Sequence, residues 1–267
     1  MIINVTVLII IFFTGTTVAF SQSLEDEAIA LSEAAIGNVL PPLSFIDTQG
    51  RKVAISQFQG KPVLVSLVYT GCADVCPAII QNLHPAIDIA QEALGKNSFT
   101  TITVGFDTRH DSPERMRSFA KSQGVDLPNW HFLSGDQETV DKLADAVGFK
   151  IVPSAGGFDH MAQISVIDGN GLIYQQVLGG VFSPPAIVEP LKNLLFDQRN
   201  SILSVKGLAE RVKLFCTVYN SNTGRYYFNY SLFIGGVIGL ACLSLVFFWL
   251  LREFKISSRN PERSSHL

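Results

Sequence analysis

Charged residues are scarce in this chain, and no stretch outside its extreme C-terminus is rich in lysine or arginine. Asp, Glu, Lys and Arg make up 16% of the 267 residues, and the formal net charge is -3. A protein with this balance has no general electrostatic attraction to nucleic acid, so we expect no nucleic-acid partner. The combination of few charges with 47% hydrophobic residues indicates membrane segments rather than an unusually apolar globular protein.

One uncharged stretch lies at the N-terminus. Residues 1–20 are mostly apolar, and Ala19-Phe20-Ser21 matches a small-residue cleavage site. We therefore expect a signal peptide over residues 1–21. An uncleaved N-terminal anchor is the alternative, because the segment has no basic residue at its start. Under either interpretation the middle of the chain is exported.

A second uncharged stretch, Ser231 to Leu251, is long enough to cross a hydrocarbon core of ~30 Å. Arg and Lys residues follow it closely, so the positive-inside rule places the tail, residues 252–267, in the cytoplasm. Aromatic residues flank the stretch as they do at membrane interfaces, namely Trp249 on one side and Tyr226, Tyr227 and Tyr230 on the other. The sequence thus predicts a C-terminally anchored protein whose main domain faces the periplasm or an equivalent space.

The chain has only four cysteines, and the predicted topology separates one of them from the others. Cys242 lies in the predicted span, where it is a small apolar residue. Cys72, Cys76 and Cys216 face an oxidising compartment, in which disulfides persist. A structural disulfide framework normally uses an even number of cysteines. At least one of these three thiols therefore has another task.

Residues 43–198 show the patterns of one α/β domain, preceded by a lead-in segment over 22–42 and followed by a juxtamembrane extension over 199–230. The order of its predicted elements is an N-terminal β-hairpin over 43–56, a buried strand over 63–69, a helix opened by Pro77, a buried strand over 99–106, helices over 113–124 and 136–147, strands over 162–167 and 171–178, and a helix over 186–196. This order, with one strand leading into a cysteine-bearing helix, is typical of a thioredoxin-like fold.

Cys72 and Cys76 stand four residues apart where the first buried strand gives way to a helix. Their spacing places both thiols on one helix face, and a helix N-terminus stabilises thiolate and lowers its pKa. Three interpretations remain open. The pair is a structural disulfide, since its Cα atoms lie near ~6 Å apart; or a thiol-disulfide oxidoreductase site, although the usual redox pair has two intervening residues; or a metal site, since soft thiolates favour Cu(I) or zinc.

A third ligand favours the metal site, and the chain offers five histidines. Four have ordinary positions on a poorly matched helix face, beside loops or beyond the predicted span: His84, His110, His131 and His266. His160 differs because it follows a glycine-rich loop directly before a predicted strand. In a thioredoxin-like fold that loop lies against the N-terminus of the cysteine helix. His160 is therefore placed to complete a Cys-Cys-His site, with Asp159 as a partner that orients the ring.

Three motifs occur in order along the domain: Cys72-x-x-x-Cys76-Pro77, Val104-Gly105-Phe106-Asp107-Thr108 running into Asp111-Ser112-Pro113-Glu114, and Asp159-His160. With these motifs the chain resembles the Sco family, also called SenC or PrrC, over roughly Leu43 to Leu195. The resemblance implies a thioredoxin fold that binds one copper ion, Cu(I) and also Cu(II), through Cys72, Cys76 and His160. It also implies a location in a bacterial inner membrane, with the main domain in the periplasm.

The same resemblance implies a metallochaperone that assists assembly of the copper centre of a cytochrome c oxidase. Its partners are then the copper-receiving subunit of a respiratory haem-copper oxidase, copper donor and thiol reductant proteins, and the membrane. A thiol-disulfide oxidoreductase that keeps the cysteines of the oxidase copper site reduced is the alternative. Reduced thiols are required for copper binding, so disulfide formation between Cys72 and Cys76 switches the site off.

Three features depart from the family pattern. Many members carry an N-terminal anchor, whereas the clear span here is C-terminal, as in a bacterial subset. Met161 follows the candidate histidine where a small or hydroxylated residue is expected; we expect it to pack in the core, with a soft metal ligand as the alternative. Cys216 lies in the juxtamembrane extension without an assigned task. A free thiol is expected there, and delivery of copper or electrons at the membrane surface is the alternative.

Overall fold

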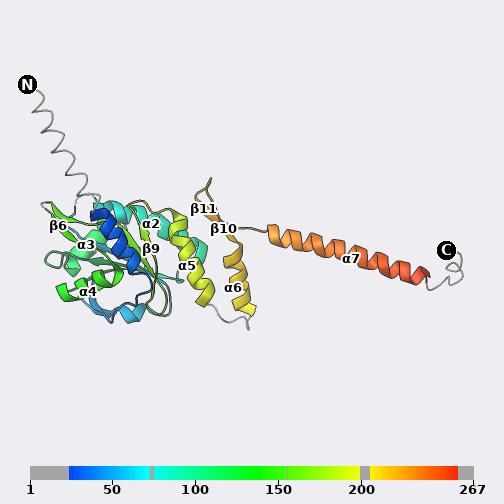
Figure 1. Ribbon diagram of the computed structural model, residues 1–267, viewed down its shortest axis with the longest axis horizontal. Coiled ribbons are helices and arrows are strands. Elements are labelled where there is room, and N and C mark those ends of the chain that lie inside the picture. Colours follow the sequence, from blue (N-terminus) through cyan, green and yellow to red (C-terminus); the bar gives the residue numbers. More distant parts are fainter. Residues whose placement is uncertain (1–23, 73–74, 155, 199–204, 258–267) are drawn as a thin grey trace, which may run out of the picture.

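A seven-stranded sheet forms the centre of the molecule (Figure 1). The computed structural model describes residues 24–72, 75–154, 156–198 and 205–257, so the predicted signal peptide and residues 258–267 of the predicted tail lie outside it. The strands follow the order β2-β1-β5-β4-β3-β8-β9 across the sheet. Their bounds are β1 Ser44–Asp47, β2 Lys52–Ala54, β3 Val63–Val68, β4 Thr100–Gly105, β5 Trp130–Ser134, β8 Gln163–Ile167 and β9 Ile173–Leu178.

The three central strands are parallel, and the strands that flank them on either side are antiparallel to them. Strands β3, β4 and β5 pair in parallel, while β1 joins β5 and β8 joins β3 in antiparallel fashion. All residues of β3 and β4 are buried, as expected for strands covered on both faces. The predicted α/β, thioredoxin-like arrangement with an N-terminal hairpin is therefore confirmed.

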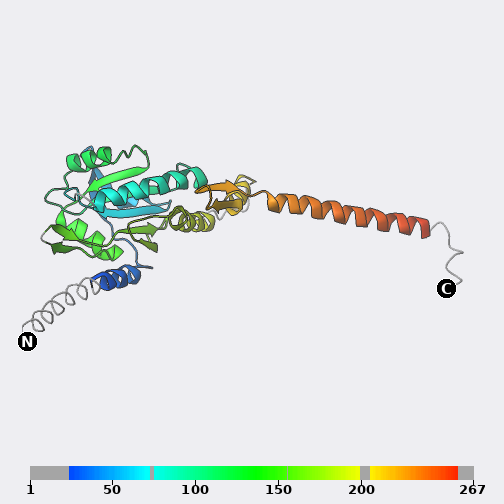
Figure 2. The same cartoon turned by 90° about the horizontal axis from the view of Figure 1, so that it is seen from above.

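Helices cover both faces of this sheet. They are α2 Val75–Leu94, α3 Pro113–Ser122, α4 Gln137–Val147 and α5 Pro184–Gln198. Since β3, β4 and β5 advance in one direction through right-handed crossovers, α2 and α3 lie on the same face. Helix α4 lies on the opposite face with the helix of residues 24–34 (Figure 2). Helices α2 and α5 pack against each other.

The helix of the lead-in segment is closely packed against the domain. Gly148, which ends α4 with φ +65°, lies so near this helix that an added Cβ would collide with the carbonyl oxygen of Leu31. A left-handed conformation already favours glycine, and the close approach requires it. Lys150 also forms an ion pair with Glu27. The lead-in segment is therefore part of the folded body.

The juxtamembrane extension has secondary structure that the sequence patterns did not predict. It forms α6 (Val205–Cys216) and a hairpin of β10 (Thr217–Asn220) and β11 (Arg225–Phe228). Strand β5 and a two-stranded hairpin of β6 (Val152–Ser154) and β7 (Gly157–Asp159) were also not predicted from the sequence.

Helix α7 (Ser231–Ser257) leaves the body as a long, isolated helix (Figure 1). Its segment Ser231–Arg252 has a mean hydropathy of 2.4 and no buried side chains. Within the described ranges, it is the one helix that is long and apolar enough to cross a membrane. The predicted span of residues 231–251 coincides with it.

Candidate metal centre

The loop that carries Cys72 is held by a buried carboxylate. Strand β3 ends at Val68, and the backbone N–H and hydroxyl of Thr70 both donate to Oδ1 of Asp111, at 2.8 and 2.7 Å. Oδ2 of Asp111 accepts from the backbone N–H of Asp107 at 2.9 Å. Burial raises the pKa of Asp111, and these hydrogen bonds oppose that shift. One carboxylate thus joins the loop after β3 to the loop after β4.

The two cysteines differ in exposure: Cys72, just before the start of α2, is partly exposed, and Cys76, just after it, is buried. Cys76 is fully buried in the first turn of the helix, whereas Cys72 precedes the helix and keeps some exposure. The backbone N–H of Cys76 donates to Sγ of Cys72 at 3.4 Å. No disulfide joins the two thiols. They therefore stand about one turn apart, as their spacing predicted.

His160 reaches the cysteines from a separate hairpin. It follows β7 directly, and its Nε2 lies 3.6 Å from Sγ of Cys76, although the two residues are 84 positions apart in the chain. Its Nδ1 is 3.4 Å from the carbonyl oxygen of Met161. The expected placement of this loop against the cysteine helix is thus found. The ring is oriented by the neighbouring backbone carbonyl, however, and not by a hydrogen bond to Asp159.

Aromatic rings surround the imidazole of His160. The centroids of Phe106, Phe149 and Tyr69 lie 5.3, 5.4 and 6.0 Å from it. Tyr69 also packs edge-on against Phe158 of β7 at 5.4 Å. These rings could not be identified from the sequence, because they come from four separate segments whose proximity is created only by the fold.

Burial determines the ionisation of the two residues in contact. It lowers the pKa of His160, so the ring is a neutral imidazole at neutral pH and has a lone pair available for a metal. It raises the pKa of Cys76 to about 12. The expectation that the helix N-terminus lowers the pKa of this thiol is therefore wrong. Loss of hydration in the apolar surroundings outweighs the helix dipole, as it does for buried cysteines generally.

The sulfur and nitrogen donors of Cys72, Cys76 and His160 suit a soft metal ion, although the three residues are not close enough together to form a preformed site. Within the described parts of the chain, no group of three His, Cys, Asp or Glu residues is close enough to be identified as a metal site. Sγ of Cys76 nevertheless lies 3.6 Å from Nε2 of His160, and Sγ of Cys72 accepts a hydrogen bond from the backbone N–H of Cys76. Thiolate and imidazole are ligands of Cu(I) and zinc.

The other histidines of the described chain have partners elsewhere. His84 lies 3.7 Å from Asp88 and packs against Trp130. His110 is 2.7 Å from Asp107, and His131 packs against Phe58. Their interpretation as ordinary residues agrees with these contacts, while His266 lies outside the described residues.

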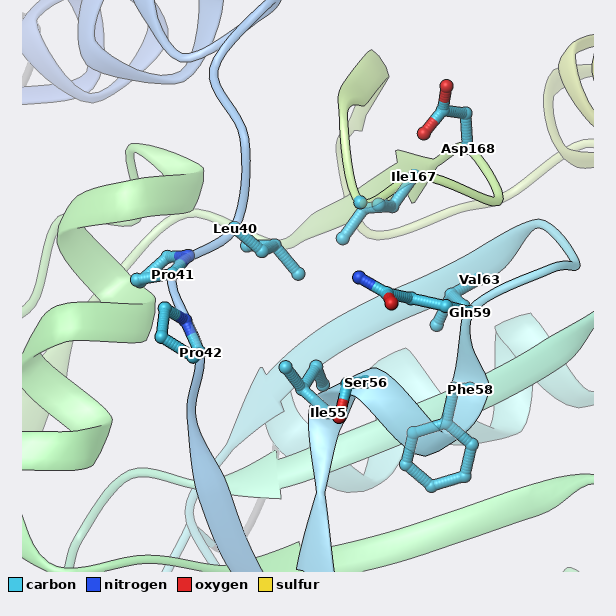
Figure 3. A pocket seen from close by; sticks show the side chains of 11 residues that line it. Leu40, Pro41, Pro42, Ile55, Ser56, Phe58, Gln59, Val63, Ile167 and Asp168 are labelled. Carbon is cyan, nitrogen blue, oxygen red and sulfur yellow. The ribbon is translucent and has the colours of Figure 1, made fainter.

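A separate apolar cavity of about 180 Å³ lies at the other end of β3 (Figure 3). It is lined by side chains that include Leu40, Ile55, Val63 and Ile167. Val63 begins β3, whereas Cys72 follows the end of that strand. The cavity is therefore distinct from the cysteine–histidine site and contains none of its donors.

Comparisons with known proteins support the resemblance. The sequence model of the SCO1/SenC family matches residues 33–195. The SCO1 protein homolog of Bacillus subtilis is 22% identical over 143 residues, which cover 52% of this chain and 72% of that protein. A solved structure from Aquifex aeolicus VF5 is 27% identical with a TM-score of 0.55, covering 59% of this chain and 92% of that one.

Two further solved structures share the fold. Arabidopsis thaliana ScoI with copper bound is 18% identical, with a TM-score of 0.52 over 58% of this chain and 99% of that one. BsSco is described as a member of the Sco family of cytochrome c oxidase assembly proteins, in which a disulfide switch was identified. It is 20% identical to this chain, with a TM-score of 0.51, and the match covers 60% of this chain and 94% of that one. Because the family match covers more than half of the sequence and includes Cys72, Cys76 and His160, the chain belongs to the SCO1/SenC family.

Proposed function

We propose that this protein is a copper metallochaperone, which binds one copper ion through Cys72, Cys76 and His160. The observation that carries the proposal is the 3.6 Å contact between Sγ of Cys76 and Nε2 of His160, with Cys72 one helical turn away. The copper ion is cargo rather than a resident cofactor. Two thiolates and one imidazole form a soft, three-coordinate site, which suits Cu(I) and leaves a position open to a ligand from the recipient.

The recipient that fits best is the copper-receiving subunit of a respiratory haem-copper oxidase. Support comes from membership of a family whose solved relatives include a copper-bound ScoI and a member described with cytochrome c oxidase assembly. We place the main domain in the periplasm, anchored to the inner membrane by Ser231–Arg252. Residues 43–198 then form the copper-binding domain and residues 199–230 the juxtamembrane extension.

Anaerobic titration of the reduced full-length protein with Cu(I), against a chromophoric chelator, tests the copper proposal. We expect saturation at one equivalent and a large loss of affinity in His160→Ala. The matched control is His110→Ala, which removes an exposed histidine paired with Asp107 and should leave the affinity unchanged. Unaltered affinity in His160→Ala would refute the three-ligand site.

A thiol-disulfide oxidoreductase is the second candidate, and the different exposure of the two cysteines favours it. Cys72 is accessible to a partner disulfide, while Cys76 is buried behind it. In such a reaction the two thiols become a Cys72–Cys76 disulfide, while the partner's disulfide takes up the two electrons and two protons. Rapid reduction of insulin disulfides by a protein without copper affinity would favour this function over the metallochaperone.

A further inference from the structure

The juxtamembrane module, defined here as α6, β10 and β11, is fixed to the domain through one of its faces. Nζ of Lys192 donates to the carbonyl oxygen of Thr217 at 2.7 Å, and the hydroxyl of Tyr226 donates to Oε1 of Glu189 at 2.8 Å. Leu214 is buried on the same side. Lys192 and Glu189 both belong to α5, so the module is attached to that helix as a defined unit.

The opposite face of the module exposes apolar and aromatic side chains. Val218 and Tyr227 are direct cross-strand partners, so they project from the same face of the hairpin, and both are exposed. Phe215, near the end of α6, is 63% exposed, and Tyr230, which packs against Phe228 directly before α7, is 64% exposed. Tyr226 lies on the inner face, so its expected role as an interfacial aromatic does not agree with its hydrogen bond to Glu189.

The direction of α7 shows what this outer face meets. Helix α6 lies on the side of the body from which α7 departs, and it runs across the direction of α7 (Figure 1). The candidate span begins at Ser231, immediately after Tyr230. If α7 crosses a bilayer, α6 and the outer face of the hairpin are therefore held at the level of its headgroups.

We propose that the outer face of the module, with Phe215, Val218 and Tyr227, rests on the anionic lipid surface around α7, and that Tyr230, directly before α7, lies at the same surface. Aromatic rings are favoured at the membrane–water interface. The exposed Lys213 on the module supplies a charge that complements anionic headgroups. The proposal depends on the proposed membrane span, and it adds a second contact that fixes the orientation of the domain.

The test uses the full-length protein in vesicles of mixed zwitterionic and anionic phospholipids with bromine near the headgroup end of the acyl chains. Quenching of native Trp249 first reports whether α7 is inserted. Phe215→Trp in a Trp249→Phe background then reports the position of the module, while buried Trp130 gives a constant signal. The matched control is Val181→Trp in the same background, because Val181 is 83% exposed on the domain.

We expect brominated lipid to reduce the emission of the Phe215→Trp variant but not that of the Val181→Trp variant. Adding Lys213→Glu to the Phe215→Trp variant should reduce this quenching in anionic vesicles, with little effect in zwitterionic ones. Quenching of Trp249 in the native chain without quenching in the Phe215→Trp variant would overturn the proposal and leave the span intact.

Two further outcomes would also overturn the lipid contact. A blue-shifted but unquenched emission in the Phe215→Trp variant would replace the lipid surface with a protein occupant, such as a second copy of this chain. Absence of Trp249 quenching in the native chain would refute the span and the lipid contact together.

Discussion

The polar groups around the two ends of helix α2 are used in opposite ways. At its N-terminal end, Cys76 and His160 make only a 3.6 Å contact, and their burial keeps both uncharged. Beyond its C-terminal half, the juxtamembrane module packs against α2 and α5, and the groups of Tyr226 and Lys192 are paired at 2.7–2.8 Å. Groups that satisfy one another join structural parts, whereas donors without strong partners remain available to a ligand.

The largest effect should follow from removing a donor at the first end. Cys76→Ser keeps the approximate volume but removes the sulfur, and we expect Cu(I) affinity to fall by more than about 100-fold, because loss of groups that merely support a ligand already costs about 10–100-fold. The measurement is anaerobic Cu(I) competition. Cys216→Ser is the control, since Cys216 is also a buried thiol outside any disulfide. An equal loss of Cu(I) affinity in both variants would contradict the proposal that Cys76 is a copper ligand.

Copper affinity should also depend on pH, in a direction set by the buried thiol. Since the pKa of Cys76 is raised to about 12, copper must displace a proton from it at neutral pH. Affinity should therefore fall by about tenfold per pH unit from this thiol alone as the pH decreases. The lowered pKa of His160 keeps the imidazole available until more acidic pH. The same competition over a series of pH values measures this slope, and a pH-independent affinity would contradict a protonated Cys76.

A moderate effect is expected at the second end. Tyr226→Phe removes the hydrogen bond to Glu189, and we expect the opening free energy of the module to fall by about 1 kcal/mol. Amide hydrogen exchange over residues 205–230 measures it. Tyr219→Phe is the matched control, because its hydroxyl makes no hydrogen bond within the described residues. Cu(I) affinity should be unchanged in both variants; a change in Tyr226→Phe alone would show that the two ends are coupled.

The smallest effect should come from the ion pair of Arg225 and Glu92, whose atoms are 4.0 Å apart with both side chains largely exposed. Exposed pairs of this kind contribute about 0–1 kcal/mol. Arg225→Gln should therefore change hydrogen exchange of the hairpin by less than Tyr226→Phe does. A larger loss would show that this exposed pair with α2, rather than the hydrogen bonds to α5, holds the module to the domain.

The sequence predicted the elements with strong local patterns and missed those that depend on distant partners. The runs of β3 and β4, rich in β-branched residues, and the Ser112-Pro113 helix start were recognisable alone. Strand β5 was missed because it has five residues and its apolar run is interrupted by His131. The β6–β7 hairpin contains Pro153 and Gly157, which weaken any strand pattern.

For the candidate site, the spacing of Cys72 and Cys76 was sufficient to single them out. His160 required the fold and the family resemblance, because its contact with Cys76 spans 84 positions. The pKa of Cys76 could not be deduced from its place at a helix start. Its value depends on the burial of the thiol among residues far apart in the sequence. The metal ligands themselves stay a prediction.

The length of α2 sets a distance that any recipient must accommodate. The helix has 20 residues and is therefore about 30 Å long, with the cysteine–histidine end at one terminus and the module beside α7 near the other. In the proposed orientation, the proposed copper site then lies about 30 Å above the lipid surface, a height similar to the thickness of the hydrocarbon core. The fitting recipient is one whose copper-binding part projects from the membrane to a comparable height.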